Sequence, residues 1–257
     1  LEVQNKELAT LAEQQKEKDR ILSELKKQEK QLNNQISAKR KQMQKVDNAI
    51  AAAIKRAQKE AIAKAAEEEK ARKAAAAKEA MAISGGNKPD VNTKSVTSPG
   101  KTTAPAKKPA ESILLNDASS IALNASFEKN RGTLPWPVDR GMVLMHYGNN
   151  KLPSGSDLVT SSITISSNIG NPVKAVFDGT VTAVQPIEDM QVVILQHGRY
   201  FTTYSNLTGV TVQRGQQVKT GQVLGRVAAN FDGIGAIDFY MSNETSNFDP
   251  ERWLRNR

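Results

Sequence analysis

The sequence predicts a long N-terminal α-helix or coiled coil followed by a mainly antiparallel β domain. Residues 1–84 contain no glycine or proline and are dominated by Ala, Lys, Glu and Gln, which favour helix. Residues 142–241 instead show short apolar alternations cut by glycines, which is typical of small antiparallel strands. The stretch between them, residues 85–110, is rich in Gly, Pro, Ser, Thr and Lys, and we expect a disordered linker there.

A heptad repeat covers the first two-thirds of the predicted helix, with apolar residues at both core positions and a few polar interruptions. The a positions hold Leu8, Leu22, Ile36, Met43 and Ile50, the d positions hold Leu11, Leu25, Leu32, Val46 and Ala53, and the polar interruptions are Gln15, Lys18, Glu29 and Lys39. A single helix cannot bury this stripe, so we expect a partner helix. The candidates are the upstream half of an antiparallel hairpin and a second copy of the chain, and a solvated single helix is the alternative. Because the sequence opens within the helical pattern at Leu1, we also expect an upstream part that includes a targeting signal.

Residues 111–131 are predicted to form a short helical arm, capped by Asn116 or Asp117 and ended by Gly132. Its apolar residues are Leu114, Leu115, Ile121, Leu123 and Phe127. A helix this short is marginal alone, so it must pack on something. Two interpretations stay open: the arm completes the core of the β domain, or it covers a groove there and inhibits it, together with the alanine-rich helix Ala61–Ala82.

The β domain is assigned to residues 132–257. The predicted strands are Val143–Tyr147, Ser162–Ile165, Val173–Phe177, Thr180–Val184, Val192–Gln196, Tyr200–Tyr204, Val210–Val212, Val223–Val227 and Ala236–Met241. The pair Asp178-Gly179 predicts a hairpin between two of them, because this pair fits a tight two-residue turn.

Composition excludes several function classes. The net charge of +9 belongs to the helix and the linker, whereas residues 111–257 carry 12 basic and 13 acidic side chains. A basic face for nucleic acid would normally lie on the folded domain, so we expect no nucleic-acid partner. Without cysteine there are no disulfides or thiolate metal sites. No apolar run approaches the ~20 residues that a transmembrane helix needs.

Residues 132–256 carry a series of short motifs in a characteristic order. They are Leu134–Val138, Gly170–Val176, Asp178–Val181, His197-Gly198, Tyr204, Leu207, Gly215–Val218, Gly221-Gln222, Asp249-Pro250 and Trp253-Leu254. This order and spacing resemble the LytM (lysostaphin-type) metallopeptidase domain. The resemblance implies a β-sheet fold whose active members cleave peptidoglycan cross-bridges. Such members bind zinc through a His, an Asp four residues later and the last His of a His-x-His pair, and a His in a Tyr-Ala-His-Leu motif assists catalysis.

These positions hold other residues in this chain. Thr160 and Thr164 stand in the first pair, Asn206 replaces the histidine of the Tyr-Ala-His-Leu motif, and the His-x-His place reads Ala236-Ile237-Asp238. We therefore expect no catalytic residues, no metal and no cofactor, since a catalytic zinc needs three protein ligands. His197 matches a non-ligand histidine of the family. A rebuilt site from His146, Asp157 and Asp238 is a weaker alternative.

A coiled coil, a linker and a degenerate LytM domain together resemble the EnvC-type family of murein hydrolase activators. The resemblance implies a periplasmic protein, peripheral to the inner membrane at the division site. Its coiled coil would dock on an FtsEX-like membrane complex, and its domain would bind and activate a peptidoglycan amidase. We expect the amidase in the vestigial groove, which is predicted to be lined by Thr160, Thr164, Ile187, Met190, Tyr204, Asn206, Asp238 and Tyr240.

A periplasmic adaptor of an efflux or secretion system is the alternative. The segment Gly215–Val218 followed by Gly221–Gly225 also suits a lipoyl-like barrel, and such adaptors carry helical hairpins. Their lipoyl halves flank the hairpin on both sides, however, whereas all predicted strands here follow the helix.

Overall fold

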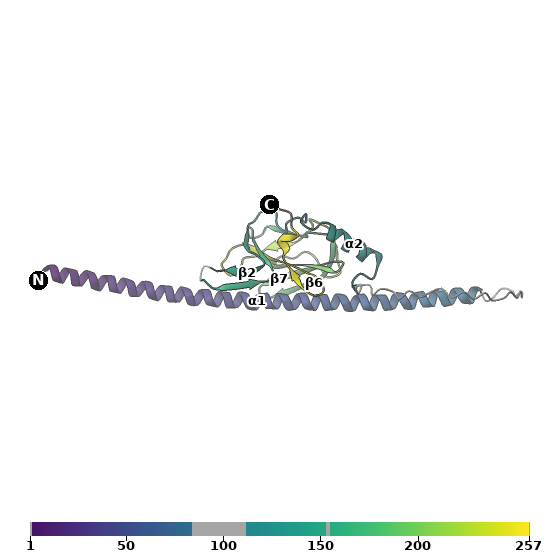
Figure 1. Ribbon diagram of the computed structural model, residues 1–257, viewed down its shortest axis with the longest axis horizontal. Helices are drawn as coiled ribbons and strands as arrows, with labels where there is room; N and C mark the ends of the chain where they lie inside the picture. Colours follow the sequence, from purple (N-terminus) through teal and green to yellow (C-terminus); the bar gives the residue numbers. More distant parts are fainter. Residues whose placement is uncertain (1, 84–111, 153–154, 257) are drawn as a thin grey trace, which may run out of the picture.

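Helix α1 (Glu2–Ile83) is a long rod that runs alongside a β domain built from the C-terminal half of the chain (Figure 1). The computed structural model describes residues 2–83, 112–152 and 155–256, with the side chains of α1 described between residues 10 and 75. The predicted linker, residues 85–110, lies outside the described residues. The predicted order of a long helix followed by an antiparallel β domain is confirmed. No helix in the described ranges has an apolar stretch long enough to cross a membrane.

The heptad seam of α1 faces the β domain over the middle of the helix. Its buried residues follow the heptad spacing and are Ile36, Met43, Val46, Ile50, Ala53 and Ala57. The expectation of a partner helix is therefore wrong for residues 36–57, where the partner is a sheet. Before this region the seam is open, since Leu11, Leu22 and Leu25 are all about half exposed or more.

The β domain contains one large antiparallel sheet and one small one. In the large sheet the central order is β1-β4-β11-β8-β7-β6-β9, β10 pairs with both β5 and β8, and β12 pairs with β11. The strands are β1 (Val143–Met145), β4 (Ile163–Ser166), β5 (Pro172–Lys174), β6 (Gly179–Ile187), β7 (Met190–His197), β8 (Tyr200–Thr208), β9 (Gln217–Val218), β10 (Val223–Val227), β11 (Ala236–Ser242) and β12 (Asn247–Phe248). Strands β2 (Gly148–Lys151) and β3 (Asp157–Thr160) form the small sheet, and a short 3-10 helix, η1 (Pro250–Arg252), follows β12.

Two local predictions were wrong. Val210–Val212 is not a strand, because the chain turns at Gly209 and, of its three backbone amides, that of Thr211 bonds a strand carbonyl, at Leu224, whereas that of Val210 bonds the side chain of Gln191. Asp178-Gly179 does not close a hairpin either, since β5 pairs with β10 while β6 pairs with β7 and β9. The Asp178 carboxylate instead pairs with Lys219 and accepts hydrogen bonds from the amide and hydroxyl of Thr220, and these contacts lower its pKa.

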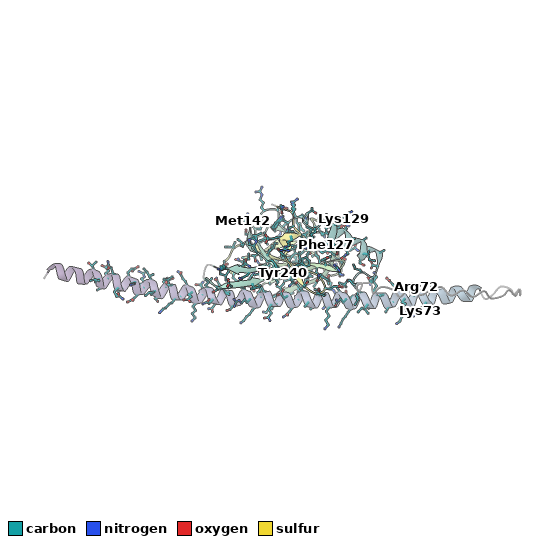
Figure 2. All side chains as sticks on the ribbon, in the orientation of Figure 1. Arg72, Lys73, Phe127, Lys129, Met142 and Tyr240 are labelled. Carbon is teal, nitrogen blue, oxygen red and sulfur yellow. The ribbon has the colours of Figure 1, made fainter. Side chains whose placement is uncertain are left out.

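Both faces of the large sheet are buried. Because side chains alternate between the two faces along each strand, one strand contributes residues to both clusters. One face meets the main core, to which β7 contributes Val193 and Leu195 and β11 contributes Phe239. The opposite face meets α1 in a second cluster. That cluster consists of Val46, Ala49, Ile50, Ala53 and Ala57 from α1, Leu114, and Ala183, Ile187, Met190, Val192, Ile194, Phe201 and Tyr240 from the sheet. In Figure 2 Tyr240 lies close to α1, whereas Arg72 and Lys73 lie on the part of α1 beyond the domain.

The predicted arm forms α2 (Ala118–Lys129), capped by Asp117 as expected. Phe127 of α2 is fully buried in the main core and stacks on His197, with 4.9 Å between ring centroids. Burial lowers the pKa of His197 to about 4, so its ring is neutral and bonds the Asp178 carbonyl and the Thr202 hydroxyl. At its C-terminal end, then, the arm completes the core.

Candidate functional site

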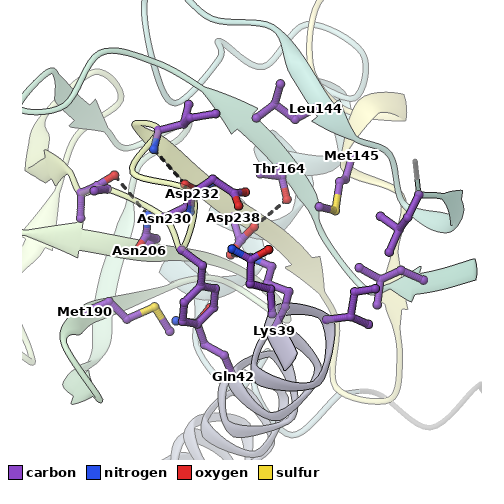
Figure 3. Close-up of a pocket in the computed structure, with 18 of the residues that line it drawn as sticks. Lys39, Gln42, Leu144, Met145, Thr164, Met190, Asn206, Asn230, Asp232 and Asp238 are labelled. Atoms are coloured by element: carbon purple, nitrogen blue, oxygen red, sulfur yellow. Dashed lines mark hydrogen bonds and ion pairs between the residues drawn. The ribbon is translucent and has the colours of Figure 1, made fainter. Parts of the chain in front are cut away.

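A cavity of about 420 Å³ lies between α1 and the β domain (Figure 3). Its helical wall runs from Leu32 to Gln42 of α1. The domain supplies residues from several strands and from the loop that precedes β11, and these include Leu144, Met145, Leu158, Thr164, Asp189, Met190, Asn206, Phe231, Asp232, Ile234 and Asp238. The cavity therefore joins residues that lie about two hundred positions apart in the sequence.

Asp238 of β11 forms the centre of this site. Its Oδ1 accepts a 2.6 Å hydrogen bond from the Thr164 hydroxyl on the neighbouring strand β4, where the two residues are cross-strand partners. Its Oδ2 lies 2.6 Å from the ammonium nitrogen of Lys39 on α1. Only 3% of Asp238 is exposed, so its charge is balanced by Lys39 rather than by water. Figure 3 shows Lys39 projecting from α1 toward this carboxylate.

Asn206 lines the same cavity from a bulge in β8. Ser205 and Asn206 together oppose one residue of β7, and Asn206 has a φ of 61°, which asparagine tolerates better than most residues. Its side-chain amide donates to the carbonyls of Ala236, at 2.7 Å, and Ala228, at 3.2 Å. The amide is thus engaged in holding the bulge against β11.

The structure brings together part of the predicted groove set. Thr164, Met190, Asn206 and Asp238 line the cavity. Ile187 and Tyr240 lie on the same sheet face, outside the cavity but beneath α1. Burial raises the pKa of Tyr240 well above its ordinary value.

The other two predicted groove residues, Thr160 and Tyr204, also lie outside the cavity. Tyr204 is fully buried in the main core and packs against Phe239, because both residues point to the face opposite Asp238. Its hydroxyl accepts the Val176 amide. The hydroxyl of Thr160 is likewise engaged in structure, since it bonds the backbone carbonyls of His146 and Ser162.

The groove is covered by a different segment from the expected one. The arm residue Phe127 lies in the main core, Leu114 packs under α1, Ile121 is half exposed, and Leu115 and Leu123 are partly buried. The covering residues come from α1, with Lys39 at the centre. Sequence reasoning missed this role, although a signal existed: Lys39 occupies a d position, where it interrupts an otherwise apolar seam.

Further polar contacts fix α1 on the domain. The Ser161 hydroxyl donates to Asp47 at 2.9 Å, Lys45 pairs with Glu188 at 2.6 Å, and Arg40 donates to the Asp157 carbonyl. Farther along, Arg214 pairs with Glu60. Burial raises the pKa of Asp47, because its hydrogen bonds only partly offset the loss of water.

The residues at this site do not fit the zinc that LytM-type peptidases bind. Of the three positions that correspond to zinc ligands, Thr160, Thr164 and Asp238, only Asp238 offers a charged ligand, and its two oxygens are already engaged by Thr164 and Lys39. The alternative site around His146 is not assembled, since His146 pairs with Glu251 on the surface at 2.7 Å. Within the described ranges no three His, Asp or Glu side chains are placed to hold a metal ion.

Comparisons with known proteins agree with the fold. Residues 159–250, which make up less than half of the chain, match Peptidase family M23. No curated protein matches the chain.

Several solved structures are similar to it over the β domain. Csd3 of Helicobacter pylori is 18% identical with a TM-score of 0.42, and the match covers 49% of this chain and 35% of Csd3. A zinc-containing peptidase from Vibrio cholerae is 23% identical with a TM-score of 0.42, over 49% of this chain and 41% of the peptidase. The catalytic domain of lysostaphin from Staphylococcus simulans is 21% identical with a TM-score of 0.36, over 43% of this chain and 89% of that domain.

The match to the family profile includes the strands that carry Thr164, Asn206 and Asp238. The similarity to Peptidase family M23 thus extends over the strands that build the candidate site.

Proposed function

We propose that this protein is a non-catalytic activator of peptidoglycan amidases in cell division and daughter-cell separation. One observation carries the proposal: the ammonium group of Lys39 lies 2.6 Å from Asp238, the residue that the resemblance to LytM-type peptidases aligns with a zinc ligand. A side chain of the protein's own long helix thus occupies the centre of a former active site. Such an arrangement suits a regulated binding surface better than a hydrolytic one.

The donor set supports a role without hydrolysis. Metal-assisted hydrolysis needs three protein ligands that leave a position open for water. Thr160, Thr164 and Asn206 offer neutral oxygens, and their side chains already bond Asp238 or backbone carbonyls. Nothing in this set activates a water molecule.

The sheet face beneath α1 has the character of an interface. Without α1 it would present a contiguous apolar surface that includes Ile187, Met190, Ile194, Phe201 and Tyr240. Large apolar surfaces of this kind are rare on proteins without a partner, and aromatic side chains at their centre commonly anchor binding. We assign the amidase to this face and to the adjoining vestigial groove, so that α1 and the amidase compete for it.

The uncovered part of α1 is assigned to the second partner. Leu11, Leu22 and Leu25 extend the heptad seam beyond the β domain, Ile21 lies beside it, and all four are between 49% and 62% exposed. We propose that this part docks on an FtsEX-like membrane complex in the periplasm, at the division site. Tension or rearrangement at that end would be transmitted along the rigid helix and would lift residues 32–57 from the sheet.

The adaptor alternative has less support. It assigns the segments around Gly215 and Gly221 to a lipoyl-like barrel. The match to Peptidase family M23 spans both segments, so the proposal keeps the activator function.

Two adjacent alanines of α1 provide a matched test. Ala53 is 4% exposed against the sheet, whereas Ala52 is exposed on the other side of the helix. Ala53→Glu should loosen α1, because it places a charge in an apolar contact, and Ala52→Glu changes the net charge equally without touching the sheet. The assay measures the release of dye-labelled peptidoglycan fragments by a purified zinc amidase in the presence of the full chain.

The expected result is at least a tenfold increase in amidase activation by Ala53→Glu, with Ala52→Glu equal to the wild type. The chain alone should release no fragments. Equal activation by all three proteins would argue against competition between α1 and the amidase. Failure of every form to bind or stimulate an amidase would refute the proposed function itself.

A further inference from the structure

We infer that the vestigial metal position has become a binding site for a basic side chain, filled by Lys39 when α1 is docked. When α1 leaves, the partner fills the site with a lysine or arginine of its own. This inference rests on the proposed function for the identity of the partner. The site itself follows from the geometry around Asp238.

The carboxylate of Asp238 is held in a fixed position and is shielded from water. It is 3% exposed, it accepts a hydrogen bond from Thr164 at 2.6 Å, and it pairs with Lys39 at 2.6 Å. Thr164 contributes a neutral donor, so Lys39 supplies the compensating charge. The side chain of Lys39 is itself only 17% exposed, which makes this pair far less screened than an ion pair on the surface.

A partner that replaces α1 on this surface shields Asp238 from water again, but without the charge of Lys39. A buried carboxylate that loses its cation is strongly destabilised, whereas exchange of one cation for another is close to neutral. The state in which α1 is displaced is therefore favoured when the competitor brings a cation to Asp238. An ammonium or a guanidinium group fits, because a single carboxylate is too few ligands for zinc but sufficient for a charged hydrogen bond.

The walls of the cavity agree with this choice of ligand. Asp189 and Asp232, which are both exposed, also line it, so acidic residues outnumber Lys39 around the cavity. The remaining surface is largely apolar, and Leu144, Phe231 and Ile234 in it are each about half exposed. A basic residue with apolar neighbours is complementary to both features.

The residues that α1 presents to the site indicate what kind of partner segment would replace it. Lys39 lies three residues after Ile36 and four before Met43, so all three project from one side of the helix. Both apolar neighbours are buried. We commit to an amphipathic partner helix with a basic residue in the middle of an apolar stripe, which replaces α1 on the same surface.

The site can be probed with the protein's own helix as the competitor. The receptor is the full chain carrying Lys39→Met, whose docked helix lacks the cation and is therefore displaced more easily. Three fluorescent peptides of residues 29–60 serve as probes: the native sequence, Lys39→Met and Lys39→Glu. Fluorescence anisotropy measures their dissociation constants, and circular dichroism confirms that the receptor is folded.

We expect the native peptide to bind this receptor about tenfold more tightly than the Lys39→Met peptide, and the Lys39→Glu peptide to bind more weakly still. In a receptor that also carries Asp238→Asn, the difference between native and Lys39→Met peptides should disappear. Equal affinities for the three peptides would overturn the site, and this comparison does not depend on the folding of the Asp238→Asn receptor. A preference for lysine that survives Asp238→Asn in a folded receptor would overturn the assignment to Asp238.

The partner's use of the site is tested with the purified amidase. Its affinity for the Lys39→Met chain should fall about tenfold when Asp238→Asn is added. An unchanged affinity would overturn the claim that the partner supplies the cation. If no form of the chain binds an amidase, the proposed function fails, and the peptide comparison alone then decides whether the cation site exists.

Discussion

Lys39 of α1 and Asp238 of β11 lie 199 residues apart in the sequence, yet their charged atoms are separated by 2.6 Å. The pair joins the first long element of the chain to the last long strand of the sheet. Asp238 is also the residue that the resemblance to LytM-type peptidases aligns with a zinc ligand. The same contact therefore closes the groove and binds the helix to the domain.

Asp47 gives the docking of α1 a dependence on pH. Burial raises the pKa of this carboxyl above 3.8, so its protonated form is favoured when α1 is docked. The stabilisation from Asp47 is therefore complete below pH 3.8 and is lost as the pH rises through the raised pKa. At pH 7 the ionised carboxylate supports docking less than its protonated form would.

Asp47→Asn should accordingly stabilise the docked helix at pH 7 and make no difference below pH 3.8. The measurement compares the thermal transitions of the variant and the wild type at both pH values. Asp19→Asn, on the exposed part of α1, is the control and should leave the transition unchanged. A variant that is less stable than the wild type at pH 7 would contradict the cause assigned to the raised pKa.

Phe127 tests whether the arm supports the domain or covers the groove. Phe127→Ala should lower the free energy of unfolding by about 3–5 kcal/mol, because it removes a fully buried ring from the main core. Ile121→Ala, on the exposed side of α2, should change it by about 0.5 kcal/mol or less. Denaturant unfolding measures both values. Stability unchanged by Phe127→Ala, together with stronger amidase binding, would restore the arm as the cover.

Asn206 tests the bulge that shapes the cavity. Asn206→Ala should cost about 2 kcal/mol of unfolding free energy, since the carbonyls of Ala236 and Ala228 lose a donor and alanine disfavours a positive φ. Asn206→Gly loses the same hydrogen bonds but adopts the backbone conformation readily, so a smaller loss is expected. Denaturant unfolding of the two variants separates these contributions. Equal losses would mean that the backbone conformation contributes nothing.

Much of the fold could be predicted from local patterns. The absence of glycine and proline over residues 1–84 predicted α1, and the glycine-cut alternation after Met142 predicted an antiparallel β domain. The sequence also predicted that Thr160 and Thr164 cannot supply the family's zinc ligands and that Asn206 cannot supply its catalytic histidine, because a residue's type determines which atoms it can offer. Tyr204 was misassigned, since the bulge at Ser205 and Asn206 changes which side chains share a face of β8.

Only the tertiary structure decided what α1 packs against. The heptad period and the composition of α1 define an apolar seam. The part of it from Ile36 to Ala57 could be buried equally well by a second helix or by a sheet. The choice depends on contacts between residues far apart in the sequence, which no local pattern records. In the sequence, Lys39 is a polar interruption at a core position of the heptad repeat. It became a specific contact once β11 brought the buried carboxylate of Asp238 within reach, because a cation in an apolar seam is stable only where the opposite surface supplies its counter-charge.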